Sequence, residues 1–167
     1  MLVPKWTDDD YRNAFAEGHT RNQYVADLIA SWGVWVDCPP LTFAERREDI
    51  RLYTNGEKDV ITRAGVIEVK GQRRLFTSDV NKFPYETQIV DTVESWDGKT
   101  VKPIAYVMVC MQNLECVAIP TRSEPHWTVT KRFDRYKQQE FEFYVVHRRF
   151  IRSMDDLRQH LLRHDKA

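Results

Sequence analysis

The segment of residues 57–70 constrains the fold most strongly, because charged side chains alternate there with β-branched ones. In a β-strand, successive side chains point to opposite faces of the sheet. Ile67 and Val69 therefore share one face, and Glu68 and Lys70 share the other. A carboxylate and an ammonium group are thus expected side by side on one surface of this strand.

A hairpin can bring Asp59 to the same surface, and the position of its turn decides which residue Asp59 faces. A two-residue turn at residues 63–64 makes Asp59 the direct partner of Glu68, with Cβ atoms about 4.5–5.5 Å apart. A turn at residues 64–65, which the glycine favours, pairs Asp59 with Lys70 and keeps all three groups on one face. A three-residue loop would instead turn Asp59 to the opposite face from Glu68 and Lys70. Two of the three simplest turns therefore bring two carboxylates and a lysine together.

The composition is that of a globular protein, with 42% hydrophobic and 30% charged residues in a chain of 167. Such a chain can form one domain that buries about two-thirds of its unfolded surface, and we expect a single domain over residues 1–167. No apolar run approaches the length of a membrane span, and residues 1–6 lack the apolar core of a signal peptide. We therefore expect a soluble, cytoplasmic protein with no membrane partner, whose Cys38, Cys110 and Cys116 are reduced thiols outside any metal spacing.

Helix signals dominate the N-terminal part of the chain. Thr7 is a suitable N-cap with acidic residues in the following turn, and Gly18 would end this helix. Thr20 begins a second helix with a capping box, and its apolar face extends to Gly33. A short strand is expected next, at residues 33–38.

The remaining segments alternate between strand and helix signals. Strands are expected at residues 49–54, 104–110, 115–119, 127–129 and 141–146. The Asn-Gly dipeptide at residues 55–56 favours a hairpin turn after the first of them. A short helix is expected within residues 85–95, and Ser153 would begin the last helix. This order predicts an α/β or α+β fold with a mixed β-sheet flanked by helices.

The acid-containing hairpin resembles the core of the PD-(D/E)xK nuclease superfamily, in which an acid on one strand is followed by Glu-x-Lys on the next. The matching residues are Asp59, Glu68 and Lys70, and the apolar flanks of the second motif are similar to the family's third core strand. The resemblance covers residues 18–71. It implies a restriction-endonuclease-like core and magnesium-dependent hydrolysis of phosphodiester bonds, with Mn²⁺ able to replace Mg²⁺.

The chemistry of these residues supports the same assignment. Asp59 and Glu68 offer hard oxygen ligands that suit Mg²⁺, and the backbone carbonyl of Val69 can add another. Such an ion polarises the scissile phosphate and lowers the pKa of a bound water. Lys70, on the same face, can orient that water or offset the negative charge that develops on the phosphate.

Two positions depart from the family pattern. The residue before Asp59 is Lys58 instead of proline, a change that is common in the superfamily. The family's first helix often carries an acid that reaches the metal, near residues 22–23, where this chain has no charged side chain. Glu17 could take that role if the chain bends at the following glycine, and Gln23 is the other candidate, as a polar ligand.

Short motifs also occur by chance, and the chain contains a second acid-x-Lys triplet at residues 97–99. Its Asp-Gly dipeptide is typical of a turn, and no strand pattern supports it. For the first motif, the structural alternative is an exposed strand face on which Lys70 forms salt bridges with its acids.

Several basic and polar residues are candidate DNA contacts. Arg73 and Arg74 directly follow the motif, whereas Lys131 and Arg132 belong to a later basic stretch. Gln88 lies where several branches of the superfamily place a glutamine near the site. The 25 basic and 25 acidic side chains of the whole chain cancel, which argues against a general nucleic-acid coat but permits a local basic groove.

These features predict a metal-dependent nuclease that acts on DNA, as an endonuclease of phage type in replication, recombination or repair. Symmetric substrates such as DNA junctions would suggest a homodimer. Two other hypotheses remain open. One is a nuclease-like fold that binds nucleic acid or protein without cleavage, and the other is a structural subunit of a larger assembly.

Overall fold

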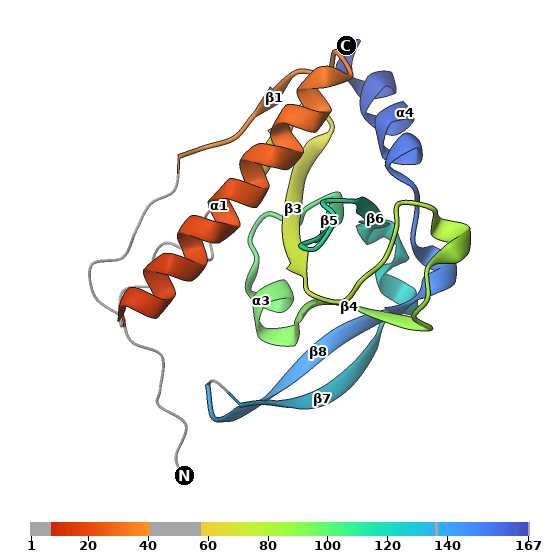
Figure 1. Cartoon of the computed structure of the whole chain (residues 1–167). Coiled ribbons are helices and arrows are strands. Elements are labelled where there is room, and N and C mark those ends of the chain that lie inside the picture. Colours follow the sequence, from red (N-terminus) through yellow and green to blue (C-terminus); the bar gives the residue numbers. More distant parts are fainter. Residues whose placement is uncertain (1–7, 41–57, 136, 167) are drawn as a thin grey trace.

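The computed structural model describes the backbone of residues 8–40, 58–135 and 137–166, with side chains from residue 18 onward (Figure 1). The strand expected at residues 49–54, its Asn-Gly turn and the Thr7 cap lie outside the described residues. The expected mixture of helices and strands is confirmed, since helices pack with two separate β-sheets.

The elements follow one another as a helix, a hairpin and then a series of strands with short helices. The first part contains α1 (Asp8–Ser31), β1 (Val36–Asp37), β2 (Val60–Thr62), β3 (Gly65–Gln72), the 3₁₀ helix η2 (Val80–Lys82), β4 (Thr87–Thr92) and α3 (Val93–Gly98). The second part contains β5 (Ala105–Cys110), β6 (Cys116–Pro120), η3 (Thr121–His126), β7 (Thr128–Asp134), β8 (Gln139–His147), η4 (Arg148–Phe150) and α4 (Met154–Asp165).

The larger sheet has five strands in the order β1-β2-β3-β5-β6. It is mixed, because β3 pairs antiparallel with β2 and parallel with β5. The smaller sheet has three antiparallel strands in the order β4-β8-β7. Figure 1 shows the β7–β8 hairpin projecting from the molecule at the end opposite to α4.

The hairpin of β2 and β3 has the two-residue turn that aligns Asp59 with Glu68. Thr62 pairs with Gly65, so the turn comprises residues 63–64. Gly65 has a φ of 141°, which glycine adopts more easily than any other residue. Continued by one residue beyond β2, this register places Asp59 opposite Glu68. The first of the expected turns is therefore confirmed.

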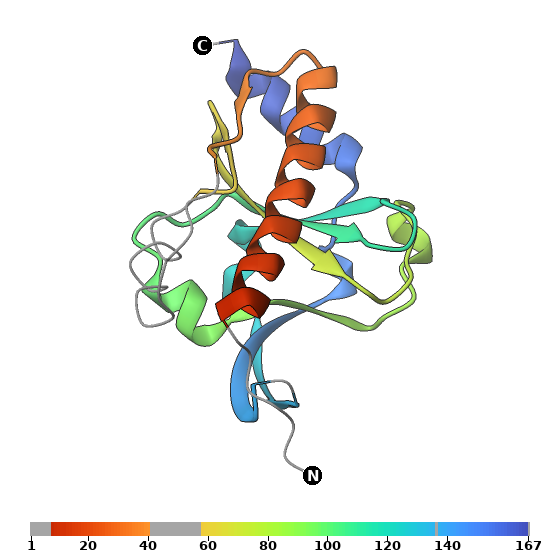
Figure 2. The same ribbon diagram turned by 60° about the vertical axis from the view of Figure 1, so that its left-hand side comes forward.

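Side chains of β5 alternate between the two faces of the larger sheet and thereby divide the core. Ala105, Val107 and Val109 belong to a cluster that includes residues of α1 and α4. Tyr106 and Met108 belong to a second cluster with α3 and the smaller sheet. Figure 2 shows α1 lying across β3 on the first of these faces.

The expectation of two N-terminal helices is wrong, because α1 runs without interruption through Gly18 and Thr20. One glycine within a helix costs only about 1 kcal/mol relative to alanine. Val25 and Ile29, further along α1, are fully buried against the larger sheet. The packing of α1 against the larger sheet outweighs the local sequence signals for a helix end at Gly18.

The expected helix within residues 85–95 is also wrong, because this segment contains β4 and only the start of α3. Gln88 and Val90 are buried, whereas Thr87 is exposed and Ile89 half-buried, which is the alternation of a strand. Thr92 then caps α3 by accepting a hydrogen bond from Ser95 N. In residues 87–90, the alternation of buried and more exposed side chains outweighs the helical signals of the sequence.

The other expected elements are confirmed within a few residues. The segments 33–38, 104–110, 115–119, 127–129 and 141–146 contain or overlap β1, β5, β6, β7 and β8. Ser153 caps α4, and its hydroxyl accepts from Asp156 N at 3.1 Å. Among the helices of the described residues, none combines the length and the apolar character needed to cross a bilayer.

Candidate active site

The face of β3 that carries Glu68 and Lys70 is turned away from α1. Ile67 and Val69 pack into the core beneath α1 and α4. Because side chains alternate along a strand, Glu68 and Lys70 point to the α3 side. The Nζ of Lys70 lies 3.0 Å from Oε1 of Glu68. The strand pattern alone therefore creates the predicted acid and lysine pair.

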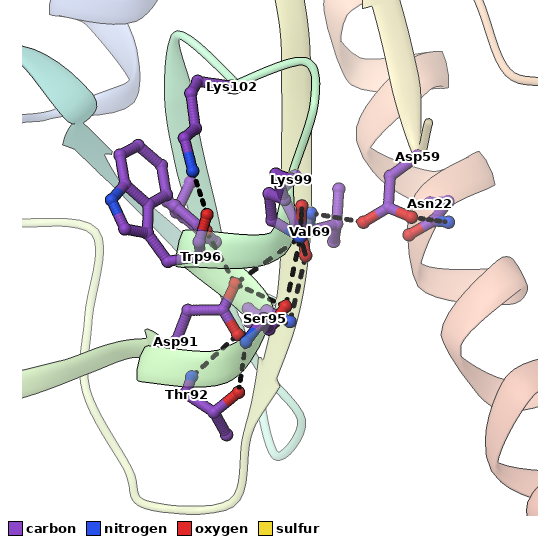
Figure 3. Close-up of polar contacts among 12 residues, drawn as sticks. Asn22, Asp59, Val69, Asp91, Thr92, Ser95, Trp96, Lys99 and Lys102 are labelled. Carbon is purple, nitrogen blue, oxygen red and sulfur yellow. Dashed lines mark hydrogen bonds and ion pairs between the residues drawn. The ribbon is translucent and has the colours of Figure 1, made fainter. Parts of the chain in front are cut away.

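Asp59 lies at the edge of β3, just before β2 begins. Its Oδ2 accepts a hydrogen bond from Val69 N at 2.8 Å, and its Oδ1 accepts one from Asn22 Nδ2 at 3.1 Å. Figure 3 shows Asp59 and Asn22 between β3 and α1, with Val69 beside them. Asp59 thus continues the hairpin ladder with its side chain and ties α1 to β3.

Electrostatics at Asp59 disfavour its charged form. Burial, and then the negative charge of Glu68, raise the pKa of Asp59 above the usual range of a carboxyl. The N–H of Val69, the ammonium of Lys70 and the amide of Asn22 oppose this rise only in part. A cation near both carboxylates would relieve the repulsion between them.

Lys99 joins the site from the C-terminal end of α3. Its Nζ lies 3.0 Å from Oε2 of Glu68 and 3.6 Å from Oδ2 of Asp91. Only 11% of the Lys99 side chain is exposed, and 16% of that of Glu68. Both oxygens of Glu68 therefore face an ammonium group, one from Lys70 and one from Lys99.

Asp91, at the end of β4, is the most deeply buried acid of the site, with 4% of its side chain exposed. Its Oδ2 accepts hydrogen bonds from Tyr106 Oη at 2.7 Å and from Ser95 Oγ at 3.1 Å, and its Oδ1 accepts one from Thr92 N. Lys70 Nζ lies 3.5 Å from the same Oδ1. Figure 3 shows Asp91, Thr92 and Ser95 on the α3 side of β3.

The charges of Lys70 and Tyr106 are fixed by these acids. Burial disfavours the ammonium form of Lys70, but Glu68 and Asp91 outweigh it and raise the pKa of Lys70 above its ordinary value. Burial, followed by the charge of Asp91, raises the pKa of Tyr106 as well. Lys70 is therefore a cation at neutral pH, and Tyr106 remains a hydrogen-bond donor.

The carboxylate–lysine cluster comprises Glu68, Lys70, Asp91 and Lys99, which are joined by ion pairs, and Asp59, which is bound to Val69 N and affected by the charges of Glu68 and Lys70. The ion pairs connect β3 with α3 and β4, and the hydrogen bond from Val69 N connects β3 with Asp59. When Asp59 is ionised, three carboxylates against two ammonium groups leave one negative charge in excess. The cluster is therefore suited to attract one more cationic group or a metal ion.

The helix residue that reaches the site is Asn22 and not the expected Gln23. Asn22 is buried and donates to Asp59, whereas the amide of Gln23 donates to Asp27 on the exposed side of α1. Consecutive helix residues point in directions about 100° apart, so only one of the two can face β3. Glu17 lies in α1, and its side chain is outside the described residues.

The expected DNA contacts lie in two separate places. The guanidinium of Arg74 lies 3.8 Å above the ring of Tyr85, and Gln88 is buried with its amide oxygen 3.4 Å from Arg74. Arg73 is exposed next to it. Lys131 and Arg132 are also exposed, but on β7 in the projecting hairpin. The structure does not bring Gln88 into the carboxylate–lysine cluster.

Sequence reasoning missed Lys99 and Asp91, which complete the cluster. Lys99 belongs to the triplet at residues 97–99 that was expected to be an unsupported turn, and instead lies at the end of α3. Asp91 is expected in a helix but occupies β4. The alternation of residues 87–90 could have indicated β4, but the register irregularity between Ile89 and Asp91 breaks it, so no local signal predicts the burial of Asp91.

The oxygen donors of the site are of the kind that Mg²⁺ prefers. Asp59 and Glu68 supply carboxylates, and the Val69 carbonyl points to the same edge of β3 as its N–H, which contacts Asp59. Among the described residues, no three His, Cys, Asp or Glu side chains are grouped to hold a metal by themselves. Mg²⁺ commonly binds one or two carboxylates together with waters and substrate phosphates, so the donor set fits this ion.

Comparison of the chain with protein-family models, with curated proteins and with solved structures found no match.

Proposed function

We propose that this protein is a metal-dependent nuclease that hydrolyses phosphodiester bonds of DNA, acting as an endonuclease in the cytoplasm. The observation that carries the proposal is the Glu68–Lys70 pair on β3, with the Asp59 carboxyl held at Val69 N, close enough for both charges to shift its pKa. Hydrolysis of a phosphodiester requires stabilisation of negative charge, and a partly buried lysine next to oxygen ligands can provide it.

The residues of the cluster have distinct roles in this proposal. Asp59, Glu68 and the Val69 carbonyl would hold Mg²⁺, which would supply Lewis-acid activation of the scissile phosphate and of the attacking water. Lys70 stabilises the charge on the phosphate as an ammonium group, because its raised pKa makes it a poor base at neutral pH. Lys99 and Asp91 position Glu68 and Lys70 from α3 and β4.

Cleavage of supercoiled plasmid and of branched DNA tests this proposal. The purified protein is expected to cut one of these substrates with Mg²⁺ or Mn²⁺, and EDTA is expected to stop the reaction. Glu68→Gln should lower the single-turnover rate by about 10²-fold or more. The matched control is Glu86→Gln, an exposed residue outside the cluster, whose rate should equal that of the unaltered protein. Equal activity of both variants would contradict the proposal.

One observation favours a second function, in which the fold binds DNA without cutting it. Both carboxylate oxygens of Glu68 are within 3.0 Å of a lysine, so they are already neutralised without a metal. A site of this kind would bind DNA equally well in Mg²⁺ and in EDTA and would leave it intact. Binding and cleavage measured on the same labelled DNA, with and without EDTA, distinguish the two functions.

A further inference from the structure

A cavity of about 440 Å³ lies between α4 and the edge of the larger sheet, away from the carboxylate–lysine cluster. Ala118 of β6 and Leu157 of α4 line it, and both belong to the core on the α1 and α4 face of the sheet. Glu68 and Lys70 point to the opposite face. The cavity is therefore a second site, separated from the first by the sheet.

Three arginines line this cavity, namely Arg122 of η3, Arg152 just before α4, and Arg163 of α4. None of them forms an ion pair within the part of the chain that the structure describes. Among the described residues that line the cavity, Asp156 is the one acidic residue. Three guanidinium groups against one carboxylate leave an excess of positive charge.

The position of Arg152 is fixed by the backbone. Arg152 and Ala118 form a β-bridge, with N–H to carbonyl distances of 2.8 and 2.9 Å. One guanidinium nitrogen of Arg152 donates to the carbonyl of Arg149 at 2.7 Å. This contact orients the planar group before any ligand arrives, which lowers the entropic cost of binding an anion.

The electrostatic field within the cavity is positive where His160 lines it. Burial, followed by the charges of His164, Arg163 and Arg122, lowers the pKa of His160. Its imidazole is therefore neutral at neutral pH and can form a hydrogen bond to a ligand. An anion entering the cavity would reduce the repulsion among these cationic groups.

We propose that this cavity binds a phosphate monoester of an organic molecule with both polar and apolar surface, that is, a ligand with the chemistry of a nucleoside monophosphate. Guanidinium groups match the geometry of phosphate oxygens, and three arginines line this cavity. Ile104, Pro120 and Leu157 provide an apolar wall that inorganic phosphate would not need. The volume lies in the range of about 300–1,000 Å³ that is typical of small-ligand sites.

Titration of the full-length protein with AMP, adenosine and inorganic phosphate tests the inference. Backbone amide NMR spectra, recorded in EDTA, show which residues respond and exclude metal-dependent binding at the other site. AMP is expected to shift the resonances of residues that line the cavity, and adenosine should bind at least about tenfold more weakly. A dinucleotide with a 5′-phosphate distinguishes a free nucleotide from a strand end as the source of the same group.

Variants on α4 and η3 make the test specific. The double variant Arg122→Gln/Arg163→Gln should weaken AMP binding by about tenfold or more, because it removes two charge-assisted contacts. Arg158→Gln, on the same helix but outside this cavity, should bind AMP like the unaltered protein. A thermal unfolding curve confirms that each variant is folded. Equal binding of AMP and adenosine, or full affinity in the double variant, would overturn the inference.

The outcome is independent of the nuclease assay. Binding of AMP in EDTA with no DNA cleavage would leave the cavity proposal intact and contradict the proposed function alone. DNA cleavage without any response of the cavity residues to AMP or to the phosphorylated dinucleotide would contradict the cavity proposal alone.

Discussion

Lys99 shows how a single residue outside the recognisable motif sets the charge of the site. It contacts Glu68 and Asp91 at once and is itself only 11% exposed. Without it, Glu68 would face a single lysine and Asp91 would keep only the more exposed Lys70. The cluster would then hold three carboxylates with one cation, an arrangement that costs stability in a partly buried place.

Replacement of Lys99 by methionine is therefore expected to destabilise the protein. The free energy of unfolding should fall by about 1–3 kcal/mol, because two partly buried carboxylates lose a charged hydrogen-bond donor. Urea denaturation followed by fluorescence measures the change. Lys82→Met, at an exposed position of η2, is the matched control and should change stability by less than about 0.5 kcal/mol. Equal values for the two variants would contradict the assigned role of Lys99.

Asp59 predicts a pH dependence of stability with a definite sign. Because its pKa is raised in the folded state, the folded protein binds this proton more tightly than the unfolded chain. The stabilisation that this proton gives to the folded protein is thus fully present below the pKa of Asp59 in the unfolded chain, about 3.9. It is lost as pH rises through the pKa of Asp59 in the folded protein. The difference in unfolding free energy between the unaltered protein and Asp59→Asn should therefore decrease from pH 3.5 to pH 7. An increase over this interval would contradict the assignment.

Part of the site could be predicted from local sequence alone. Strand alternation pairs Glu68 with Lys70, and the turn at residues 63–64 places Asp59 beside Val69, the residue between them. Lys99 could not be predicted in the same way, because α3 places it across a separation of 31 residues from Glu68. Such long-range contacts depend on how α3 packs against the sheet, which local periodicity does not specify.

At the scale of elements, the β2–β3 hairpin controls the geometry of the site through its turn. Gly65 adopts a φ of 141°, and a Cβ added there would lie 2.6 Å from Cγ2 of Ile104. Both the backbone conformation and the contact exclude a larger residue. A shift of this turn by one residue would move Asp59 away from Glu68.

Gly65→Ala is accordingly expected to lower the free energy of unfolding by about 1–3 kcal/mol, through backbone strain and overpacking. The matched control is Gly98→Ala in α3, where no atom lies within 4 Å of an added Cβ. Alanine is favoured over glycine in a helix by up to about 1 kcal/mol, so this control should be neutral or stabilising. Chemical denaturation compares the two, and a stabilised Gly65→Ala would contradict the turn geometry.

Helices and strands whose apolar residues follow one clear sequence pattern could be predicted. Those whose sequence mixes helix and strand signals could not. β5 is a continuous apolar run buried on both faces, and α4 has a Ser153 cap with a periodic apolar side. In contrast, β4 has polar residues on both faces, with Gln88 and Asp91 among the buried ones. Their burial depends on partners from other segments, such as Tyr106, which no local pattern reveals.

At the scale of the whole molecule, the basic residues are distributed as a few local groups on a chain of balanced charge. The order of helix and strand signals was enough to predict the mixed architecture. The separation into two sheets was not predictable, because β4 pairs with β8 across more than fifty residues (residues 87–147). Figure 1 shows that this second sheet carries the projecting β7–β8 hairpin.

The β7–β8 hairpin predicts a salt-dependent contribution to DNA binding. Lys131 and Arg132 are exposed on β7, so each can neutralise one phosphate. In the double variant Lys131→Gln/Arg132→Gln, the slope of log K against log salt should become shallower by about 2. Fluorescence anisotropy with labelled DNA measures this slope. Arg158→Gln, on α4, is the control, and an unchanged slope in the double variant would exclude the hairpin from the DNA interface.

The central claim, that the cluster on β3 cuts DNA, is tested most directly by the single-turnover cleavage rate of Lys70→Met in Mg²⁺. The variant removes the cation that is proposed to stabilise charge on the phosphate and leaves the oxygen ligands in place. We predict a rate lower by about 10²-fold or more, with DNA affinity changed only a few-fold. A cleavage rate equal to that of the unaltered protein would contradict the account.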